Sequence, residues 1–302
     1  MNSKKYNYVC MMGGIGDQIF QFSFANYLKK KMDSDIYLDI SYYQSSYNYN
    51  KFNFFFKKVA KKKNFFIVKK SFFFDYRFLS YLRIFEILKI DKILPQIYSL
   101  FFNVDIKKFV YQFWKEKKKF KISYNSFYFG YWHKIKYVKE VKYDLNKYFI
   151  KEIIKKKKIN NFIQNNINTK TVAIHIRGGD FAYLKSHNLL NEKYYDEAIF
   201  YFNKKFNKPK FHIFTNDIKF AKKILKKHSS INKIIYIKKY NFSDTQEFCL
   251  FTCYKYAIIA NSTFSYMSSY LSKSRIISIA PRIWLLGKKL EKEKRFNKLY
   301  FI

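Results

Sequence analysis

The stretch Val172-Ala-Ile-His-Ile-Arg-Gly-Gly-Asp180 decides how the chain is interpreted. An apolar run of strand type ends at His175, and Arg177, two glycines and Asp180 follow at once. In α/β proteins, ligands bind beyond the carboxyl ends of the parallel strands. An arginine there offers a planar charged fork for phosphate oxygens, and adjacent glycines let the backbone approach a diphosphate. A strand followed by a glycine turn with a surface arginine is the alternative interpretation.

Strands and helices alternate around this stretch. Apolar runs predict strands at Thr171–Ile176, Lys210–Phe214, Lys233–Ile237, Ala257–Ala260 and Arg275–Ile279. The segments between them have helical patterns, near Glu192–Phe206, Ile218–Lys227, Asp244–Tyr254 and Phe264–Leu271. Strands separated by helices of this length indicate right-handed βαβ units, so we expect a parallel sheet in the C-terminal half.

The N-terminal half begins in the same way. We predict strands at Tyr6–Met11 and Ile36–Asp39, a helix at Gln18–Lys31, and a strand that runs into a loop at Phe127–His133. From about residue 50 to 120 the chain is aromatic and rich in lysine, and we expect helical stretches from Phe78 onward. The Lys- and Asn-rich segment 151–170, expected to be a helix followed by a loop, is the predicted boundary, giving domains at 1–160 and 161–302.

The composition indicates a folded, strongly basic protein. A hydrophobic fraction of 49% excludes a disordered chain. The 60 Lys and Arg residues against 21 Asp and Glu give a net charge of +39, which favours an anionic partner such as nucleic acid, anionic lipid or a nucleotide-sugar. Lysine is one of several heavily used residues with A/T-rich codons, so the base composition of the genome is a second explanation for the charge.

The sequence favours a cytoplasmic location. Three cysteines suit a reducing compartment, and the five residues before the first predicted strand leave no room for a signal peptide. The sequence has no run of 18 apolar residues, so we expect no membrane span. Basic stretches flanked by aromatic residues could hold the protein peripherally on the anionic inner membrane face.

Two further segments join the opening one in a resemblance. They are Met12-Gly-Gly-Ile-Gly-Asp-Gln-Ile-Phe-Gln-Phe-Ser-Phe24 and Ile258-Ile-Ala-Asn-Ser-Thr-Phe-Ser-Tyr266. In this order, and with the His-x-Arg-x-x-Asp pattern between them, they resemble glycosyltransferase family 11, the bacterial-type α-1,2-fucosyltransferases. The resemblance covers most of the chain outside residues 50 to 120. The family usually has a second arginine at Gly178, asparagine at Asp17 and tryptophan at Tyr266.

The resemblance implies an α/β protein of GT-B-like fold with two Rossmann-like domains. The N-terminal domain would bind the acceptor and the C-terminal domain the nucleotide-sugar. The implied reaction is inverting transfer of L-fucose from GDP-fucose to a terminal galactoside, in a surface glycan such as lipopolysaccharide or in an oligosaccharide, through an α-1,2 linkage.

Donor-binding residues are expected mainly after the C-terminal strands. Arg177 would contact the diphosphate, and Asp180 would orient Arg177 by a charge-assisted bond, with a cap of the following segment as the alternative role for Asp180. The polar segment Asn261, Ser262, Thr263 and Phe264 opens a helix, whose N-terminus can bind phosphate. The resemblance adds Asp217 and Glu247, the latter as a carboxylate for the guanine edge. Ordinary helix caps are the alternative for the segment and for Asp217, and a solvated helix charge is the alternative for Glu247.

Acceptor-binding residues are predicted near the first glycine turn and after the strand at 127. They are Gly14, Gln18, Trp132 and His133. The turn Gly13-Gly14-x-Gly16 lacks the full dinucleotide pattern, so a simple tight turn is the alternative. The general base is left open between Asp17, His133 and His175, and a structural histidine at a strand end is the alternative for His175.

We expect no metal or other cofactor. Asp33 and Asp35 have the spacing of a metal-bound diphosphate site, but they lie at the wrong end of the predicted strand. Two other functions stay open. One is a transferase that uses another GDP-sugar, and the other is a basic nucleic-acid-binding protein. Because basic residues are spread everywhere and no binding module is recognised, no nucleic-acid partner is expected.

Overall fold

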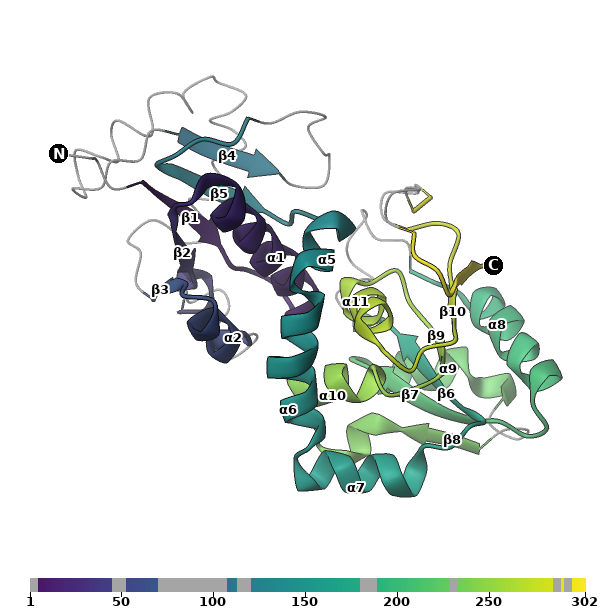
Figure 1. Cartoon of the computed structure of the whole chain (residues 1–302). Coiled ribbons are helices and arrows are strands. Elements are labelled where there is room, and N and C mark those ends of the chain that lie inside the picture. The colour runs from purple at the N-terminus through teal and green to yellow at the C-terminus, as the bar shows by residue number, and fades with distance from the viewer. Residues whose placement is uncertain are drawn as a thin grey trace. The chain divides into compact units, whose positions relative to one another are not determined.

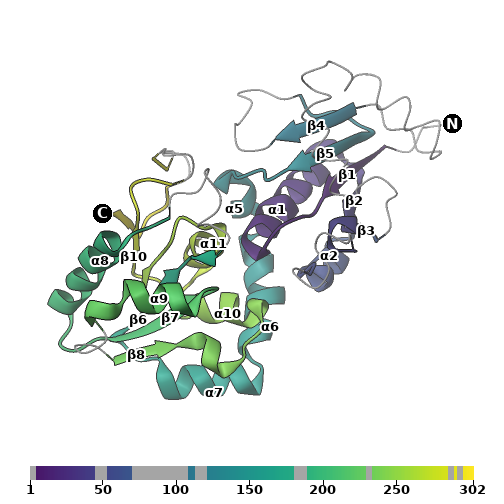
Figure 2. The same ribbon diagram turned by 180° about the vertical axis from the view of Figure 1, so that it is seen from behind.

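The computed structural model describes residues 5–44, 53–69, 108–112, 121–179, 189–228, 233–284, 289–290 and 295–302. The chain divides into two compact units, Met1–Phe149 and Ile150–Ile302. Each unit contains a parallel β-sheet with helices packed against it (Figure 1). The same elements are seen from behind in Figure 2.

The described residues of the first unit form a five-stranded sheet in the order β3-β2-β1-β5-β4, and all its pairs are parallel. Its strands are β1 Tyr6–Cys10, β2 Asp35–Asp39, β3 Phe66–Val68, β4 Lys108–Gln112 and β5 Ser126–Gly130. Its helices are α1 Ile15–Met32, α2 Lys57–Lys62 and α5 Ile135–Leu145, with a 3-10 turn at Ser41–Gln44 and a π turn at Asn146–Ile150.

The described residues of the second unit form a six-stranded parallel sheet in the order β11-β10-β9-β6-β7-β8. The strands are β6 Thr171–Ile176, β7 Lys210–Thr215, β8 Lys233–Tyr236, β9 Tyr256–Ile258, β10 Ile277–Ala280 and β11 Leu299–Phe301. The helices are α6 Lys151–Ile154, α7 Lys157–Asn166, α8 Glu192–Lys205, α9 Ile218–Ile224, α10 Asp244–Phe251 and α11 Thr263–Leu271, with 3-10 turns at Lys226–His228 and Ile237–Tyr240.

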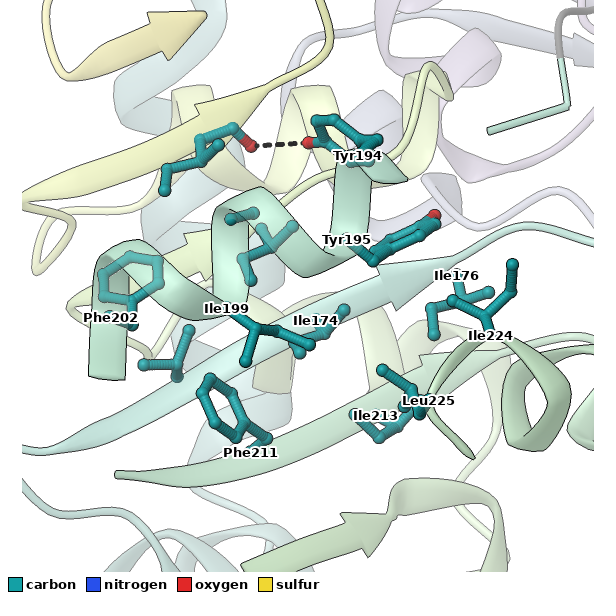
Figure 3. Packing of buried hydrophobic residues seen from close by; sticks show 14 of the residues in the cluster. Ile174, Ile176, Tyr194, Tyr195, Ile199, Phe202, Phe211, Ile213, Ile224 and Leu225 are labelled. Carbon is teal, nitrogen blue, oxygen red and sulfur yellow. Dashed lines mark hydrogen bonds between the residues drawn. The ribbon is translucent and has the colours of Figure 1, made fainter. Parts of the chain in front are cut away.

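Alternating side chains of β6 fill two separate cores. Val172, Ile174 and Ile176 face α8 and α9, where Tyr195 and Ile199 pack on them (Figure 3). Residues on the opposite face, Ala173 among them, pack against α7 and α10. Because successive strand residues point to opposite faces, His175 belongs to the face of Ala173, and its ring lies near Phe251 of α10.

Each sheet has a topological switch point, where the strand order reverses. In the second unit it lies between β6 and β9, and in the first between β1 and β5. Ligands of open α/β sheets bind at the carboxyl ends of the strands at such a point. The fold thus singles out two positions, one in each unit.

The predicted strands and helices in both halves are present, with ends that differ by a few residues. The sequence interpretation missed β3, β4, β11, α2 and α5. The described parts of the region from about 50 to 120 supply both edge strands of the first sheet, β3 and β4. The helices expected from Phe78 onward lie outside the described residues.

The segment 151–170 contains the expected helix, as α6 and α7, and the division between the two units lies before it instead of at residue 160. The first unit ends at Phe149, and α6 and α7 belong to the second unit. The apolar residues Ile159 and Phe162 of α7 are buried in its core, which explains why this Lys-rich segment folds onto the sheet. No helix in the described part of the chain has the length and apolar character needed to cross a membrane.

Candidate active site

The switch point of the second unit, between β6 and β9, brings together two of the segments quoted from the sequence. Arg177, Gly178 and Gly179 follow β6, while Asn261 and Ser262 lie between β9 and α11. His175 links the two segments, since its Nδ1 lies 2.9 Å from the Ser265 hydroxyl. Ser265 is fully buried in the first turn of α11 and was not singled out in the sequence, although it lies inside the third motif.

His175 has the environment of a structural histidine. It is 4% exposed, and burial together with the charge of Arg177 lowers its pKa to about 3. The imidazole is therefore neutral at physiological pH and is a poor proton acceptor. Among the three candidate bases, this environment disfavours His175 and gives it the task of joining β6 to α11.

The glycine loop after β6 is held by residues that follow β7. The Asn216 side chain accepts the Gly178 N–H at 3.1 Å and donates to the Gly178 carbonyl at 3.2 Å. Asp217 accepts the Gly179 N–H at 3.3 Å with one oxygen and caps α9 through the Phe220 N–H at 2.9 Å with the other. The helix-cap alternative for Asp217 is thus realised, and the same carboxylate orders the loop. Asp180 lies outside the described residues.

Gly178 is confined by its neighbours. A Cβ atom at this position would lie 2.8 Å from Phe220 Cδ1 and 3.0 Å from Asp217 Cβ, whereas the neighbouring Gly179 has a φ of +59°. Side chains are thus disfavoured by contact at Gly178 and by backbone conformation at Gly179. The arginine that the resemblance leads one to expect at Gly178 does not fit this loop unless Phe220 moves.

The N-terminus of α11 lies at the same edge of the sheet. Within this described helix, Ser262 is the N-cap residue and its side chain makes no capping hydrogen bond. The Asn261 amide donates to the Trp284 carbonyl at 3.4 Å. Thr263 and Phe264 begin the helix, and the ring of Phe264 lies 5.0 Å from His175 and 5.5 Å from Phe248 of α10.

Tyr266 occupies the place where the resemblance expects tryptophan. It is buried, and its ring packs edge-on against Trp284 and Phe296, with centroids 5.7 Å and 5.6 Å away. The position therefore keeps its aromatic packing.

Glu247 is a buried acid on the first turns of α10, next to Phe248. It is 8% exposed, and its Oε1 has no hydrogen-bond partner among the described residues. Burial raises its pKa to about 7, while Lys238 opposes this rise and Asp244 adds to it. A buried carboxyl oxygen without a partner is costly, and a ligand that donates hydrogen bonds would offset that cost. The solvated-charge alternative for Glu247 is therefore wrong.

The first switch point carries a second polar pair. Asp17 lies in the first turn of α1, after β1, and His133 follows β5. The His133 Nε2 lies 3.2 Å from Asp17 Oδ1. Gly14 precedes α1, and its carbonyl accepts the Gln18 N–H at 3.0 Å.

Gln18 and Trp132 do not have the exposure predicted for sugar contacts. Gln18 is fully buried, and its amide bonds the carbonyls of Gly13 and Asn53 and the N–H of Phe55. Trp132 is 1% exposed and stacks on Phe24 with ring centroids 3.9 Å apart. We correct both assignments, because a buried amide and a buried ring shape the turns around Asp17 and His133 instead of meeting a glycan.

Among the described residues, no group of three or more His, Cys, Asp and Glu side chains could hold a metal ion. Asp33 and Asp35 precede or begin β2, at the amino end of the sheet. Metal independence itself stays a prediction.

Both units have an α/β fold with a parallel sheet and polar residues at its switch point, and this fold is shared with known fucosyltransferases. The chain belongs to glycosyl transferase family 11, whose profile matches residues 7–300. The fold resembles the NodZ α-1,6-fucosyltransferase co-crystallised with GDP (TM-score 0.51, 12% identity, 89% of this chain and 93% of that one). It also resembles a family 9 glycosyl transferase from Veillonella parvula (TM-score 0.50, 9% identity, 100% and 88% covered).

Two curated relatives from Escherichia coli are similar in sequence. An α-1,2-colitosyltransferase is 34% identical over 164 residues, which are 51% of this chain and 54% of the relative. The O-antigen biosynthesis glycosyltransferase WbnK is 29% identical over 126 residues, which are 40% of this chain and 41% of the relative. The chain thus matches about half of the length of these relatives or less.

Proposed function

We propose that this enzyme is an inverting α-1,2-fucosyltransferase. It moves L-fucose from GDP-fucose to a terminal galactoside of a surface glycan or an oligosaccharide. Membership of family 11 supports a transferase of this kind, and the O-antigen enzyme among the relatives supports a surface glycan as the acceptor. The observation that carries the choice of a GDP donor is the buried, unsatisfied carboxyl group of Glu247.

Glu247 is suited to a guanine base. Guanine presents two adjacent N–H donors on its Watson–Crick edge, and a carboxylate can accept both. The buried Oε1 has no other partner among the described residues, so a guanine would satisfy it. Other common bases lack this pair of donors.

Arg177 and the N-terminus of α11 are suited to the diphosphate. The guanidinium can form two parallel bonds to phosphate oxygens, and the first backbone N–H groups of a helix bind anions. As the bond between the sugar and the diphosphate breaks, negative charge gathers on the leaving GDP. Arg177 and Ser262 to Phe264 would stabilise that charge.

A second donor is favoured by one specific finding. The relative with 34% identity is named as a colitosyltransferase, and colitose is L-fucose without its 3-hydroxyl group. The same guanine and diphosphate contacts would serve either sugar. GDP-colitose is therefore the alternative donor.

A donor panel tests the proposal. GDP-fucose, GDP-colitose, GDP-mannose and UDP-galactose are each offered with lactose, and the products are read by mass spectrometry with and without EDTA. We expect a product with GDP-fucose, or with GDP-colitose under the alternative, and the same rate in EDTA. Transfer from UDP-galactose alone would contradict the GDP assignment. A loss of activity in EDTA that manganese or magnesium restores would contradict metal independence.

A further inference from the structure

We infer that the outer face of α8, with the residues that follow it, is a docking surface for the anionic headgroups of a phospholipid bilayer. This surface, named the α8 patch, consists of Phe200, Tyr201, Lys204, Lys205 and Lys208. It lies outside the candidate active site, and it does not depend on which donor or acceptor the enzyme uses.

The sequence of α8 forces aromatic side chains outward. The four successive apolar residues 199–202 surround the helix, which has about 3.6 residues per turn. The core over the sheet takes only two of them, Ile199 and Phe202, which are buried (Figure 3). Phe200 and Tyr201 are left 58% and 41% exposed. Packing in the core therefore does not account for two large neighbouring rings on the outer face.

Positive charge surrounds these rings. Residues 200–210 include four lysines and no acid, and the three lysines of the α8 patch are all exposed. The acids of α8 all precede this stretch: Glu192, Asp196 and Glu197. The second half of the helix thus combines outward aromatic rings with lysines, which is the composition of helices that bind anionic membrane surfaces.

The lysines extend along aromatic rings. The Nζ of Lys204 lies 4.6 Å from the ring centroid of Phe200, and the Nζ of Lys205 lies 5.9 Å from that of Phe206. A lysine placed in this way packs its methylene stem on apolar surface and keeps its ammonium group in the polar layer. At a bilayer, the rings would enter the headgroup region and the ammonium groups would meet lipid phosphates.

The place of the α8 patch leaves the proposed donor site free. Phe206, directly after α8, packs on Tyr256 with ring centroids 4.8 Å apart, and Tyr256 begins β9. The end of α8 therefore lies at the amino ends of the strands, whereas Arg177 and the N-terminus of α11 follow carboxyl ends. A bilayer bound at the α8 patch would contact the second unit at the end of the sheet remote from the nucleotide.

Two other partners fit the α8 patch less well. A nucleic-acid base would stack on the face of Phe200, but the ammonium group of Lys204 already lies over that ring. A second copy of this chain, docked through the same surface on both sides, would bring each patch's lysines against those of the other. An anionic bilayer complements both the rings and the charge.

The aromatic part of the α8 patch is tested with a double variant of the full chain, Phe200→Ser with Tyr201→Ser. Binding to vesicles of phosphatidylglycerol and phosphatidylcholine is measured at about 0.15 M salt, where the Debye length of about 8 Å screens distant lysines. Affinity should fall by about tenfold or more, because two rings no longer leave water. Tyr143→Ser is the matched control, since Tyr143 is 66% exposed with Lys147 5.7 Å from its ring. It should bind as wild type does.

The charged part is tested with Lys204→Gln combined with Lys205→Gln. Affinity should fall by about tenfold or more, since each lysine near the surface contributes about fivefold. The matched control is Lys61→Gln with Lys62→Gln, which removes two exposed lysines from the last turn of α2 and changes the net charge equally. Its affinity should stay within about twofold of wild type, because screening limits the effect of charges away from the contact.

Phe200→Trp reports insertion directly and keeps an aromatic ring. Anionic vesicles should shift the added tryptophan's emission to shorter wavelength, and lipids brominated near the headgroup should quench it. Wild type gives the baseline for the chain's own tryptophans, and Tyr143→Trp is the control that should show neither effect.

The results distinguish the α8 patch from general attraction by charge. If both double variants bind vesicles as well as wild type does, or if Phe200→Trp shows no shift, the inference is overturned even where binding is salt-sensitive. It is also overturned if the aromatic double variant keeps its vesicle affinity but loses binding to RNA, or dissociates a dimer of the wild type. Vesicle binding needs no sugar transfer, so a failure of the proposed function leaves this test intact.

Discussion

Arg177 is the residue whose removal should harm transfer most in the second unit. Arg177→Ala should reduce kcat by at least about 10²–10³-fold, by analogy with the loss of one oxyanion donor. This factor corresponds to a loss of about 2.7–4 kcal/mol in transition-state stabilisation. Arg177→Lys should recover little, because a point charge cannot replace the bidentate fork. Steady-state kinetics with the preferred GDP donor measures both. A near-normal rate for the alanine variant would remove Arg177 from the site.

Glu247 should make GDP binding depend on pH. Its pKa of about 7 means that the carboxyl is largely protonated below neutrality, and only the charged form accepts both guanine N–H groups. GDP affinity should therefore rise as the pH increases through 7 and level off above it. Calorimetric titrations from pH 5.5 to 8.5 measure this, with Glu247→Gln as the control that keeps only the pH dependence of the GDP phosphate, whose second pKa is about 6. A wild-type profile equal to that of Glu247→Gln would contradict the guanine contact.

The same raised pKa affects the stability of the free protein. A carboxyl whose pKa rises from 4.5 to about 7 on folding stabilises the protein below pH 4.5, and this contribution is lost as the pH rises to 7. The loss amounts to roughly 3 kcal/mol at most, from 1.36 kcal/mol per pKa unit. Denaturant unfolding of wild type and Glu247→Gln at pH 5 and pH 7.5 should show it as a difference between the two proteins.

Gly178 stands where the family usually has arginine, and its neighbours leave little room for a side chain. If the arginine usual in the family were simply missing, Gly178→Arg would strengthen GDP binding. The contacts with Phe220 and Asp217 predict instead a loss of about 1–3 kcal/mol in the free energy of unfolding, the usual effect of overpacking, with no gain in GDP affinity. Phe220→Ala should relieve the crowding in the double variant, and calorimetry on all three proteins tests this. Tighter GDP binding by Gly178→Arg alone would restore the original idea.

At the scale of elements, the N-terminal cap of α10 should affect both the stability of the folded protein and its affinity for GDP. Ser243 and Gln246 form a capping box at its N-terminus, and Glu247 follows directly. Ser243→Ala should cost about 0.5–2 kcal/mol and also weaken GDP binding, because the first turn frays. Asn191→Ala is the matched control, since Asn191 caps α8 on the opposite face of the sheet. It should lower stability similarly and leave GDP affinity unchanged; equal losses of affinity would contradict the role of α10.

Elements with a strong local pattern were predictable from the sequence. Strand β6 reads as an unbroken apolar run because both of its faces are buried, and its predicted bounds are confirmed. Strands β3 and β11 were missed because they are three residues long and partly exposed. The helix in residues 151–170 was predicted, but the division between the units was placed about eleven residues too late, because the lysines of this segment mask two buried apolar side chains, Ile159 and Phe162.

The site was predictable only in part. Motifs at strand ends predicted that Arg177, Asp17 and His133 lie at the carboxyl ends of strands, and they do, after β6, β1 and β5. Their roles stay predictions. Burial separated residues that look equivalent in sequence: Gln18 and Trp132 turn inward, while their neighbours Asp17 and His133 stay open to solvent. The bond between His175 and Ser265 spans 90 residues, and no local pattern predicts such a pairing.

At the scale of the whole molecule, charge should determine association with membranes. A net charge of +39 attracts the chain to anionic lipid, with each lysine near the surface contributing up to about 1 kcal/mol. We propose peripheral, salt-sensitive attachment. Cosedimentation with vesicles containing phosphatidylglycerol should be strong at low salt and weak at high salt, and vesicles of phosphatidylcholine alone serve as the control. A protein that stays in the supernatant with anionic vesicles at low salt would contradict this proposal.

The position of β1 in its sheet has a consequence for synthesis on the ribosome. β1 is translated well before β5, one of its two neighbours in the sheet, since the bonded residues Asn7 and Ser126 are separated by 119 residues of chain. Until β5 has left the exit tunnel, that edge of β1 is an open row of backbone groups. Pairings this distant in sequence also form slowly. The nascent chain therefore exposes the centre of its first domain for most of that domain's translation, and chaperones have that interval in which to protect it.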